Sequence, residues 1–159
     1  ESKRLNKLLE DNNLMVNFYI HPKFKDYIGN FDVTSKRMRL IPYGEEPLNE
    51  LMMRCKLLIT DYSSVCWDVY YMNKPILFYQ FDYDLYNKVH GSYINMEKDL
   101  FGYRSLTMDK LLDDFENAIK NNFKQPKEFD EMRESTFAFT DKNNSARIVL
   151  EIKKMKIFD

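Results

Sequence analysis

Residues that bend or crosslink a chain are scarce in this sequence. Its 159 residues include 4 glycines, 5 prolines and 2 cysteines. There is no internal repeat, low-complexity tract or linker, which excludes fibrous and intrinsically disordered proteins. Cys55 and Cys66 stand in apolar surroundings and in no metal-ligand spacing. We therefore expect reduced core thiols and a cytoplasmic setting.

Long apolar runs and an excess of either charge are also absent. No segment approaches the roughly 20 apolar residues that a membrane helix needs. Lysine and arginine number 24 and aspartate and glutamate 25, a net charge of -1, which argues against a general nucleic-acid binder. No acidic cluster demands a metal, and we predict neither a metal nor a cofactor. The 44% of hydrophobic and 31% of charged residues indicate one globular domain with a sizeable core.

The most informative stretch is residues 57–79, which read LLITDYSSVCWDVYYMNKPILFY. Its first four residues predict a short strand buried on both faces. A helix is expected after residue 64, and Pro75 ends it before a second strand over residues 76–79. This order predicts an α/β fold with a doubly wound, Rossmann-like parallel sheet, in which ligands bind beyond the carboxyl ends of the strands.

Ser63 and Ser64 follow the first of these strands, where the helix begins. A helix N-terminus offers unpaired N–H donors and favours an anionic group such as phosphate. Asp68 lies four residues after Ser64, on the same helical face and roughly 6 Å further along. We predict phosphate at the serines and ribose at Asp68. The spacing fits equally well with Ser63 as a simple N-cap and Asp68 as a solvated helix residue. Asp61 either orients the loop or touches the ligand.

Several separated motifs carry a family resemblance. They are ITDYSSVCWD, KPILFY, residues 81–86 (FDYDLY) and Gly91-Ser92-Tyr93, which occur in that order. Over roughly residues 14–148 the chain resembles the CDP-glycerol glycerophosphotransferase family, bacterial enzymes that prime and polymerise teichoic acid-like polymers. The resemblance implies the C-terminal, donor-binding half of a GT-B-type glycosyltransferase-like fold.

His21 and Tyr43 follow two further predicted strands, over residues 14–20 and 38–41. His21 would then share the sheet edge of the serines, although a structural role is the usual one for a lone histidine. The resemblance implies a catalytic or phosphate-stabilising role for His21. Tyr43 lies where related two-domain glycosyltransferases contact the base, so it is a candidate for packing near cytosine, with an ordinary loop tyrosine as the alternative.

Three more candidates come from the resemblance. His90-Gly91 stands where the family commonly has Arg-Gly, and a histidine is charged only part of the time near neutral pH. If His90 contacts phosphate, the lack of a permanent positive charge there would change the activity or the preferred donor. Otherwise His90 is a surface residue. Ser145 and Arg147 match a family loop before the last helix. They either contact phosphate or belong to a cap and a C-terminal helix that crosses to another domain.

The rest of the chain supplies loops and amphipathic helices. We predict loops over residues 23–36 and 97–107, and helices near residues 3–10, from residue 47, and over residues 108–121, 126–137 and 146–156.

These features predict the function of a larger protein. The chain lacks an initiator Met and starts inside an apparent helix. We expect residues 1–159 to be one nucleotide-donor-binding domain, a fragment without the N-terminal acceptor domain and inactive alone. The resemblance implies a CDP-polyol donor, a membrane-linked polymer acceptor and a parent enzyme peripheral on the inner face of the cell membrane. The alternatives are a nucleotide-sugar glycosyltransferase domain and a non-catalytic interaction module of the same fold.

Overall fold

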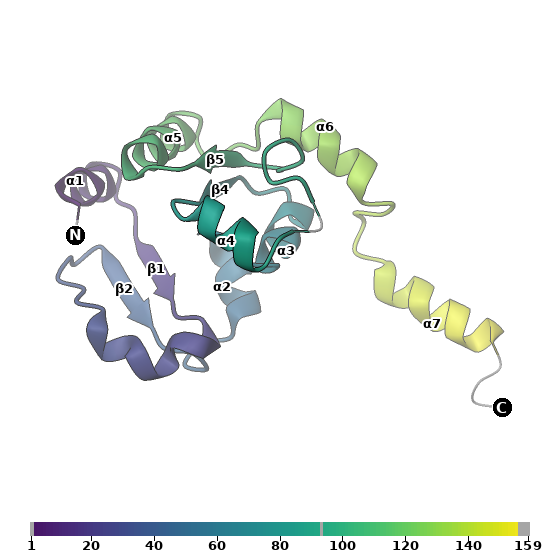
Figure 1. Ribbon diagram of the computed structural model, residues 1–159. Helices are drawn as coiled ribbons and strands as arrows, with labels where there is room; N and C mark the ends of the chain where they lie inside the picture. The colour runs from purple at the N-terminus through teal and green to yellow at the C-terminus, as the bar shows by residue number, and fades with distance from the viewer. Residues whose placement is uncertain (1, 93, 156–159) are drawn as a thin grey trace.

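Helices and strands alternate along most of the chain (Figure 1). The computed structural model describes residues 2–92 and 94–155. The elements are α1 (Lys3–Asp11), β1 (Val16–Tyr19), the 3₁₀ helix η1 (Pro22–Asn30), β2 (Met38–Ile41), α2 (Leu48–Arg54), β3 (Leu58–Thr60), α3 (Val65–Tyr71), β4 (Ile76–Tyr79), α4 (Tyr83–Val89), β5 (Tyr103–Ser105), α5 (Met108–Lys120), α6 (Lys127–Thr136) and α7 (Asn144–Lys154). Tyr93, in the last family motif, and Lys156, the predicted end of the last helix, lie outside the described residues.

The strands form two parallel sheets, as predicted for an α/β fold. β1 pairs with β2, and the second sheet has the order β3-β4-β5. The prediction that residues 57–60 form a strand is confirmed, but the prediction that it is buried on both faces is wrong. In the described residues β3 is an edge strand, and Ile59 is 39% exposed. The doubly buried strand is β4, where Ile76, Leu77 and Phe78 are at most 2% exposed.

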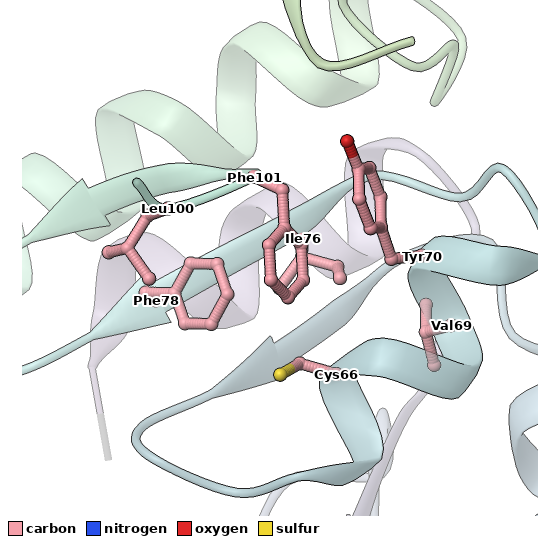
Figure 2. Close-up of a cluster of buried hydrophobic side chains, with 7 residues drawn as sticks. All are labelled: Cys66, Val69, Tyr70, Ile76, Phe78, Leu100 and Phe101. Atoms are coloured by element: carbon pink, nitrogen blue, oxygen red, sulfur yellow. The ribbon is translucent and has the colours of Figure 1, made fainter. Parts of the chain in front are cut away.

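One hydrophobic cluster lies between α3 and the β3-β4-β5 sheet. Figure 2 shows its seven side chains, Cys66, Val69, Tyr70, Ile76, Phe78, Leu100 and Phe101. The rings of Tyr70 and Phe101 stack with centroids 4.3 Å apart. The Tyr70 hydroxyl points out of the cluster and donates to the carbonyl of Phe129 on α6, at 2.7 Å. This cluster fixes α3 to the sheet and α6 to α3.

The opposite face of β4 contributes to a second cluster that reaches the other sheet. Leu77 packs there with Leu9 of α1 and with Leu111 and Phe115 of α5. Val16 of β1 and Met38 of β2 pack against the same group. Apolar packing therefore joins the two sheets, whereas no strand pairing between them occurs in the part of the chain that the structure describes.

Two predicted loops contain regular structure. Residues 22–30 form η1, which begins at Pro22 after His21 as N-cap, and residues 103–105 form β5, which pairs with β4. The predicted helices are present, and α7 lies apart from the body of the fold (Figure 1). The contact of α7 with the fold includes a hydrogen bond from the Asn144 amide to the Tyr71 hydroxyl, at 3.1 Å.

Gly102 allows the chain before β5 to approach β4 closely. A Cβ at this position would overlap the carbonyl oxygen of Ile76 and lie 3.0 Å from the ring of Phe78. We expect Gly102→Ala to lower the free energy of unfolding by about 1–3 kcal/mol, as overpacking does, in urea denaturation. Gly29→Ala is the matched control, because nothing lies within 4 Å of a Cβ there. Equal effects of the two substitutions on the free energy of unfolding would show that the close approach at Gly102 does not contribute to stability.

Candidate functional site

The carboxyl end of β3 leads into the serine pair. Ser64 is the N-cap residue of α3 by backbone position, and its side chain makes no capping hydrogen bond. Ser64 is exposed and Ser63 half-buried. Within residues 2–92 and 94–155, neither the hydroxyls nor the backbone N–H groups of the two serines have a hydrogen-bond partner. Ser64, and not Ser63, therefore occupies the N-cap position of α3. The hydroxyl and backbone N–H groups of both serines are available to a ligand.

Asp68 lies in the first turn of α3, one helical turn after Ser64. Its side chain is exposed, and no hydrogen bond to its carboxylate occurs in the described chain. The buried residues of α3 are Cys66, Val69 and Tyr70. Asp68 therefore belongs to the solvent-facing part of the helix, as a ribose contact requires.

The loop before the serines is held by its own side chains. The Asp61 carboxylate accepts a hydrogen bond from the backbone N–H of Tyr62, at 2.6 Å. The Tyr62 ring stacks on Tyr86 of α4 with centroids 3.5 Å apart, and its hydroxyl donates to Asp82 at 3.0 Å. Burial raises the pKa of Tyr62 far above its usual value, and the hydrogen bond to Asp82 raises it further. The hydrogen bond of Asp61 fits one of the two roles predicted for it, orienting the loop, and contact with a ligand stays a prediction.

Gln80 and Arg104 complete the site and were missed by the sequence analysis. Gln80 follows β4, is 0% exposed, and donates through Nε2 to the carbonyl of Asp61 at 3.3 Å. Its Oε1 accepts from Nε of Arg104 on β5, at 2.8 Å. The Arg104 guanidinium lies 4.1 Å from the centroid of the Tyr83 ring. A polar residue directly after a buried strand was the one available signal.

His21 lies at the carboxyl end of β1, as predicted, but the prediction that it shares the sheet edge of the serines is wrong, because β1 pairs only with β2 in the described residues and β3 belongs to the other sheet. Its Nδ1 accepts a hydrogen bond from the backbone N–H of Lys23, at 3.2 Å. Nδ1 as acceptor means that a neutral His21 carries its proton on Nε2. The side chain is exposed, so Nε2 can donate to a ligand.

Tyr43 and His90 are both exposed beside other aromatic rings. Tyr43 lies 6.4 Å from the ring of Tyr19, edge to face, before Gly44 with φ +88°. His90 is the C-cap of α4, and its ring lies 5.2 Å from Tyr86. His90 is therefore exposed and one ring removed from Tyr62.

Ser145 and Arg147 lie on α7, whose start is attached to the last residue of α3. Arg147 donates to both oxygens of Asp141, at 2.8 and 2.5 Å, and its guanidinium lies 3.7 Å from the ring centroid of Phe139. The hydrogen bond of this segment to α3 involves Tyr71, at the opposite end from Ser64. The structure does not bring Ser145 and Arg147 to the serine pair.

Two hollows flank the second sheet. The larger, of about 880 Å³, lies near the starts of β4 and β5, where it is lined by Pro75, Tyr103, Lys110 and Gln125. The smaller, of about 590 Å³, is polar and is bordered by Tyr83, Asn87, Asn95 and Met96. The second adjoins the site, because Tyr83 contacts Arg104 and the Met96 sulfur accepts from Gln80.

Within residues 2–92 and 94–155, no group of three or more His, Cys, Asp or Glu side chains could hold a metal ion. No helix in the same residues has the length and apolar character needed to cross a membrane.

Comparison with known proteins decides the family. The model of the family described as CDP-Glycerol:Poly(glycerophosphate) glycerophosphotransferase matches residues 1–154. The chain belongs to this family. The resemblance inferred from the motifs is confirmed, and the match extends beyond them at both ends.

Individual members of the glycerophosphotransferase family are similar over nearly the whole chain. The Minor teichoic acid biosynthesis protein GgaB of Bacillus subtilis is 28% identical over 98% of this chain and 17% of its own length. A Teichoic acid glycerol-phosphate primase of the same organism is 26% identical over 98% of this chain and 38% of its own length. The chain thus spans well under half the length of these relatives.

A solved structure supports the predicted fold class. The Wall Teichoic Acid Polymerase TagF, a GT-B-type protein, matches with a TM-score of 0.64 and 18% identity, over 94% of this chain and 46% of that one. At this identity the likeness concerns the fold. The prediction of an α/β, GT-B-type architecture with parallel sheets is confirmed.

The Tyr62–Asp82 hydrogen bond has a testable pH dependence. We expect Tyr62→Phe to lower the free energy of unfolding by about 1 kcal/mol near neutral pH, because it removes one hydrogen bond and keeps the stacked ring. A raised pKa in the folded state stabilises the fold below the unfolded pKa of about 10, and this contribution is lost as pH rises further. The difference between wild type and Tyr62→Phe should therefore shrink above about pH 10 in urea titrations.

Tyr27→Phe is the control for this titration, since the Tyr27 side chain is 58% exposed. A Tyr62→Phe difference that stays constant or grows up to pH 11 would contradict the assigned hydrogen bond.

Proposed function

We propose that this chain is the donor-binding domain of a CDP-glycerol or other CDP-polyol glycerophosphotransferase that acts in the biosynthesis of teichoic acid or a related cell-wall or capsular polymer. The family match over residues 1–154 carries the proposal. The open serine pair at the carboxyl edge of the β3-β4-β5 sheet supports it, because ligands of such sheets bind there. The acceptor would be bound by a further domain of the parent enzyme.

The reaction is a phosphoryl transfer. An acceptor hydroxyl attacks the β-phosphorus of the donor and gives its proton to a general base of the further domain, the bond from that phosphorus to the bridging oxygen breaks, and CMP leaves with the electron pair. Such a reaction needs positioning and stabilisation of charge more than covalent help. The unpaired N–H and hydroxyl groups of Ser63 and Ser64 are suited to the donor phosphates, and the exposed carboxylate of Asp68 to the ribose hydroxyls.

His21 is the proposed group for the departing or transferred phosphate. Its Nδ1 is occupied by the N–H of Lys23, so Nε2 is the available donor. From this position it can give a hydrogen bond or a proton to a phosphate oxygen. Tyr43 and His90 are exposed and remain candidates for the cytosine base and for phosphate.

The setting of the parent enzyme is also part of the proposal. Cys55 and Cys66 are free thiols, and burial raises the pKa of both, to about 11 for Cys66. Unreactive reduced thiols fit the cytoplasm. A polymer acceptor linked to the membrane would place the enzyme at its inner face, as a peripheral protein.

Nucleotide affinity tests the phosphate assignment. We expect Ser64→Ala to weaken binding of CMP and CDP-glycerol to this chain about 5- to 15-fold in calorimetry, the loss of one hydrogen bond to a charged group. Folding should be unchanged, because the Ser64 hydroxyl makes no intramolecular hydrogen bond. Ser135→Ala on α6 removes another exposed serine hydroxyl and should leave affinity unchanged.

The same measurement separates the alternatives. Preference for CMP over UMP supports the proposed donor, preference for UMP supports a nucleotide-sugar glycosyltransferase, and no nucleotide binding supports an interaction module. Comparison of CDP-glycerol with CDP-ribitol identifies the polyol. Equal affinities of Ser64→Ala and wild type would remove the phosphates from the serine pair.

His21 can be tested with a substitution that keeps its structural bond. In His21→Asn the amide oxygen can accept from the N–H of Lys23, as Nδ1 does, but no group replaces Nε2. We expect the full-length enzyme with His21→Asn to fold normally and to turn over 10²- to 10⁴-fold more slowly. Near-normal turnover would exclude His21 from the chemistry.

A further inference from the structure

Gln80 and Arg104 form a polar link between the ends of three strands. The Gln80 side chain is 0% exposed, although it contains a donor and an acceptor. Its amide joins the Asp61 carbonyl, after β3, to the Arg104 guanidinium on β5. Buried polar groups lower stability unless they are paired, so the link needs both partners.

Strand register explains why the two side chains meet. Phe78 of β4 pairs with Arg104 of β5, and Gln80 lies two residues after Phe78. Since side chains alternate along a strand, Phe78, Gln80 and Arg104 all face the α3 side of the sheet. Ser105 faces the other way and donates to Asp114 of α5, at 2.8 Å.

The guanidinium determines which way the Gln80 amide faces. A side-chain amide can present either its oxygen or its NH₂ group in one direction. The Nε–H of Arg104 is a donor without acceptor capacity, so it requires the oxygen of Gln80 and turns the NH₂ group to the carbonyl of Asp61. The reverse amide would set oxygen against oxygen there.

Arg104 itself is fixed from two sides. Its guanidinium lies over the Tyr83 ring, and within the described residues its Nη2 is buried without a hydrogen-bond partner. A buried donor without a hydrogen-bond partner lowers the stability of the fold. Such a donor is unusual in a residue whose only role is packing. Its positive charge also lowers the pKa of Tyr62, against the larger effects of burial and Asp82. Arg104 therefore acts electrostatically on the loop that carries the serines.

We infer that Arg104 is a positioning residue for the donor phosphates, which orients the Gln80 amide and through it holds the Asp61-Tyr62-Ser63-Ser64 loop in its phosphate-binding conformation. This inference rests on the proposed function and deepens it. Two nitrogens of Arg104 are not available to the donor, because Nε is bonded to Gln80 and Nη2 is buried.

Gln80→Glu gives the sharpest test. The carboxylate still accepts from Arg104, in a stronger charge-assisted bond, but it has no donor for the carbonyl of Asp61. We expect about tenfold weaker binding of CMP to this chain, measured at a temperature at which circular dichroism shows the variant to be fully folded. A role limited to stability predicts no loss of affinity, so unchanged affinity would overturn the inference.

A double-mutant cycle tests whether Arg104 acts through Gln80. We expect Arg104→Met and Gln80→Leu each to weaken CMP binding about fivefold, and the double variant to be no weaker than Gln80→Leu alone. Additive losses would overturn the inference, because Arg104 would then act independently. Arg133→Met is the control, since that guanidinium is 12% exposed, pairs with Asp130 on α6 and should not alter CMP affinity.

Hydrogen exchange separates failure of this inference from failure of the proposed function. We expect Arg104→Met to speed exchange of the Tyr62 amide, which donates to the Asp61 carboxylate, and of the Cys66 amide, which donates to the Ser63 carbonyl, at least tenfold, with no change in α5. If the wild-type chain binds no nucleotide but Arg104→Met speeds exchange as expected, only the proposed function is refuted. Nucleotide binding with unchanged exchange in Arg104→Met would refute the positioning role alone.

Discussion

The packing of α3 against the face of β4 determines where the serine pair lies. A helix of seven residues is too short to be stable alone. Val69 and Tyr70 are both 0% exposed, and burial of two such side chains contributes about 3–6 kcal/mol. Because these residues hold the helix against Ile76 and Phe101, the first turn of α3 has one position above the sheet, and Ser64 begins it.

Local sequence predicted the elements whose signal is local. The apolar stripe of α5 and the short apolar run of residues 57–60, which ends in two β-branched residues, were sufficient for both assignments. β5 was missed because Tyr103–Ser105 is three residues long with an arginine at its centre, and its strand conformation depends on pairing with β4. The burial expected for β3 was wrong for a related reason, since the neighbours of a strand are set by the whole sheet.

The residues of the candidate site also fall into those with a local sequence signal and those whose position depends on the whole sheet. Ser63, Ser64 and His21 were chosen as candidates because His21 directly follows one predicted strand and the two serines lie shortly after another. Gln80 and Arg104 were not, because 24 residues separate them and only the register of β4 with β5 brings them together. The place of His90 beside Tyr86 was not predicted, because it depends on their spacing of one turn at the end of α4, a helix that the sequence analysis did not predict.

The proposed chemistry depends on two sheets that share no strand pairing in the described residues. His21 follows β1 of one sheet, and Ser64 follows β3 of the other. Their relative position is set by side chains, since Val16 and Met38 of the first sheet pack on the cluster that contains Leu77 of the second. Apolar contacts lack the directionality of a hydrogen-bond ladder, so small shifts between the sheets are less costly than shifts within either one. Leu9 of α1, fully buried in this cluster, is therefore as relevant to the spacing of histidine and serine as any residue at the site itself.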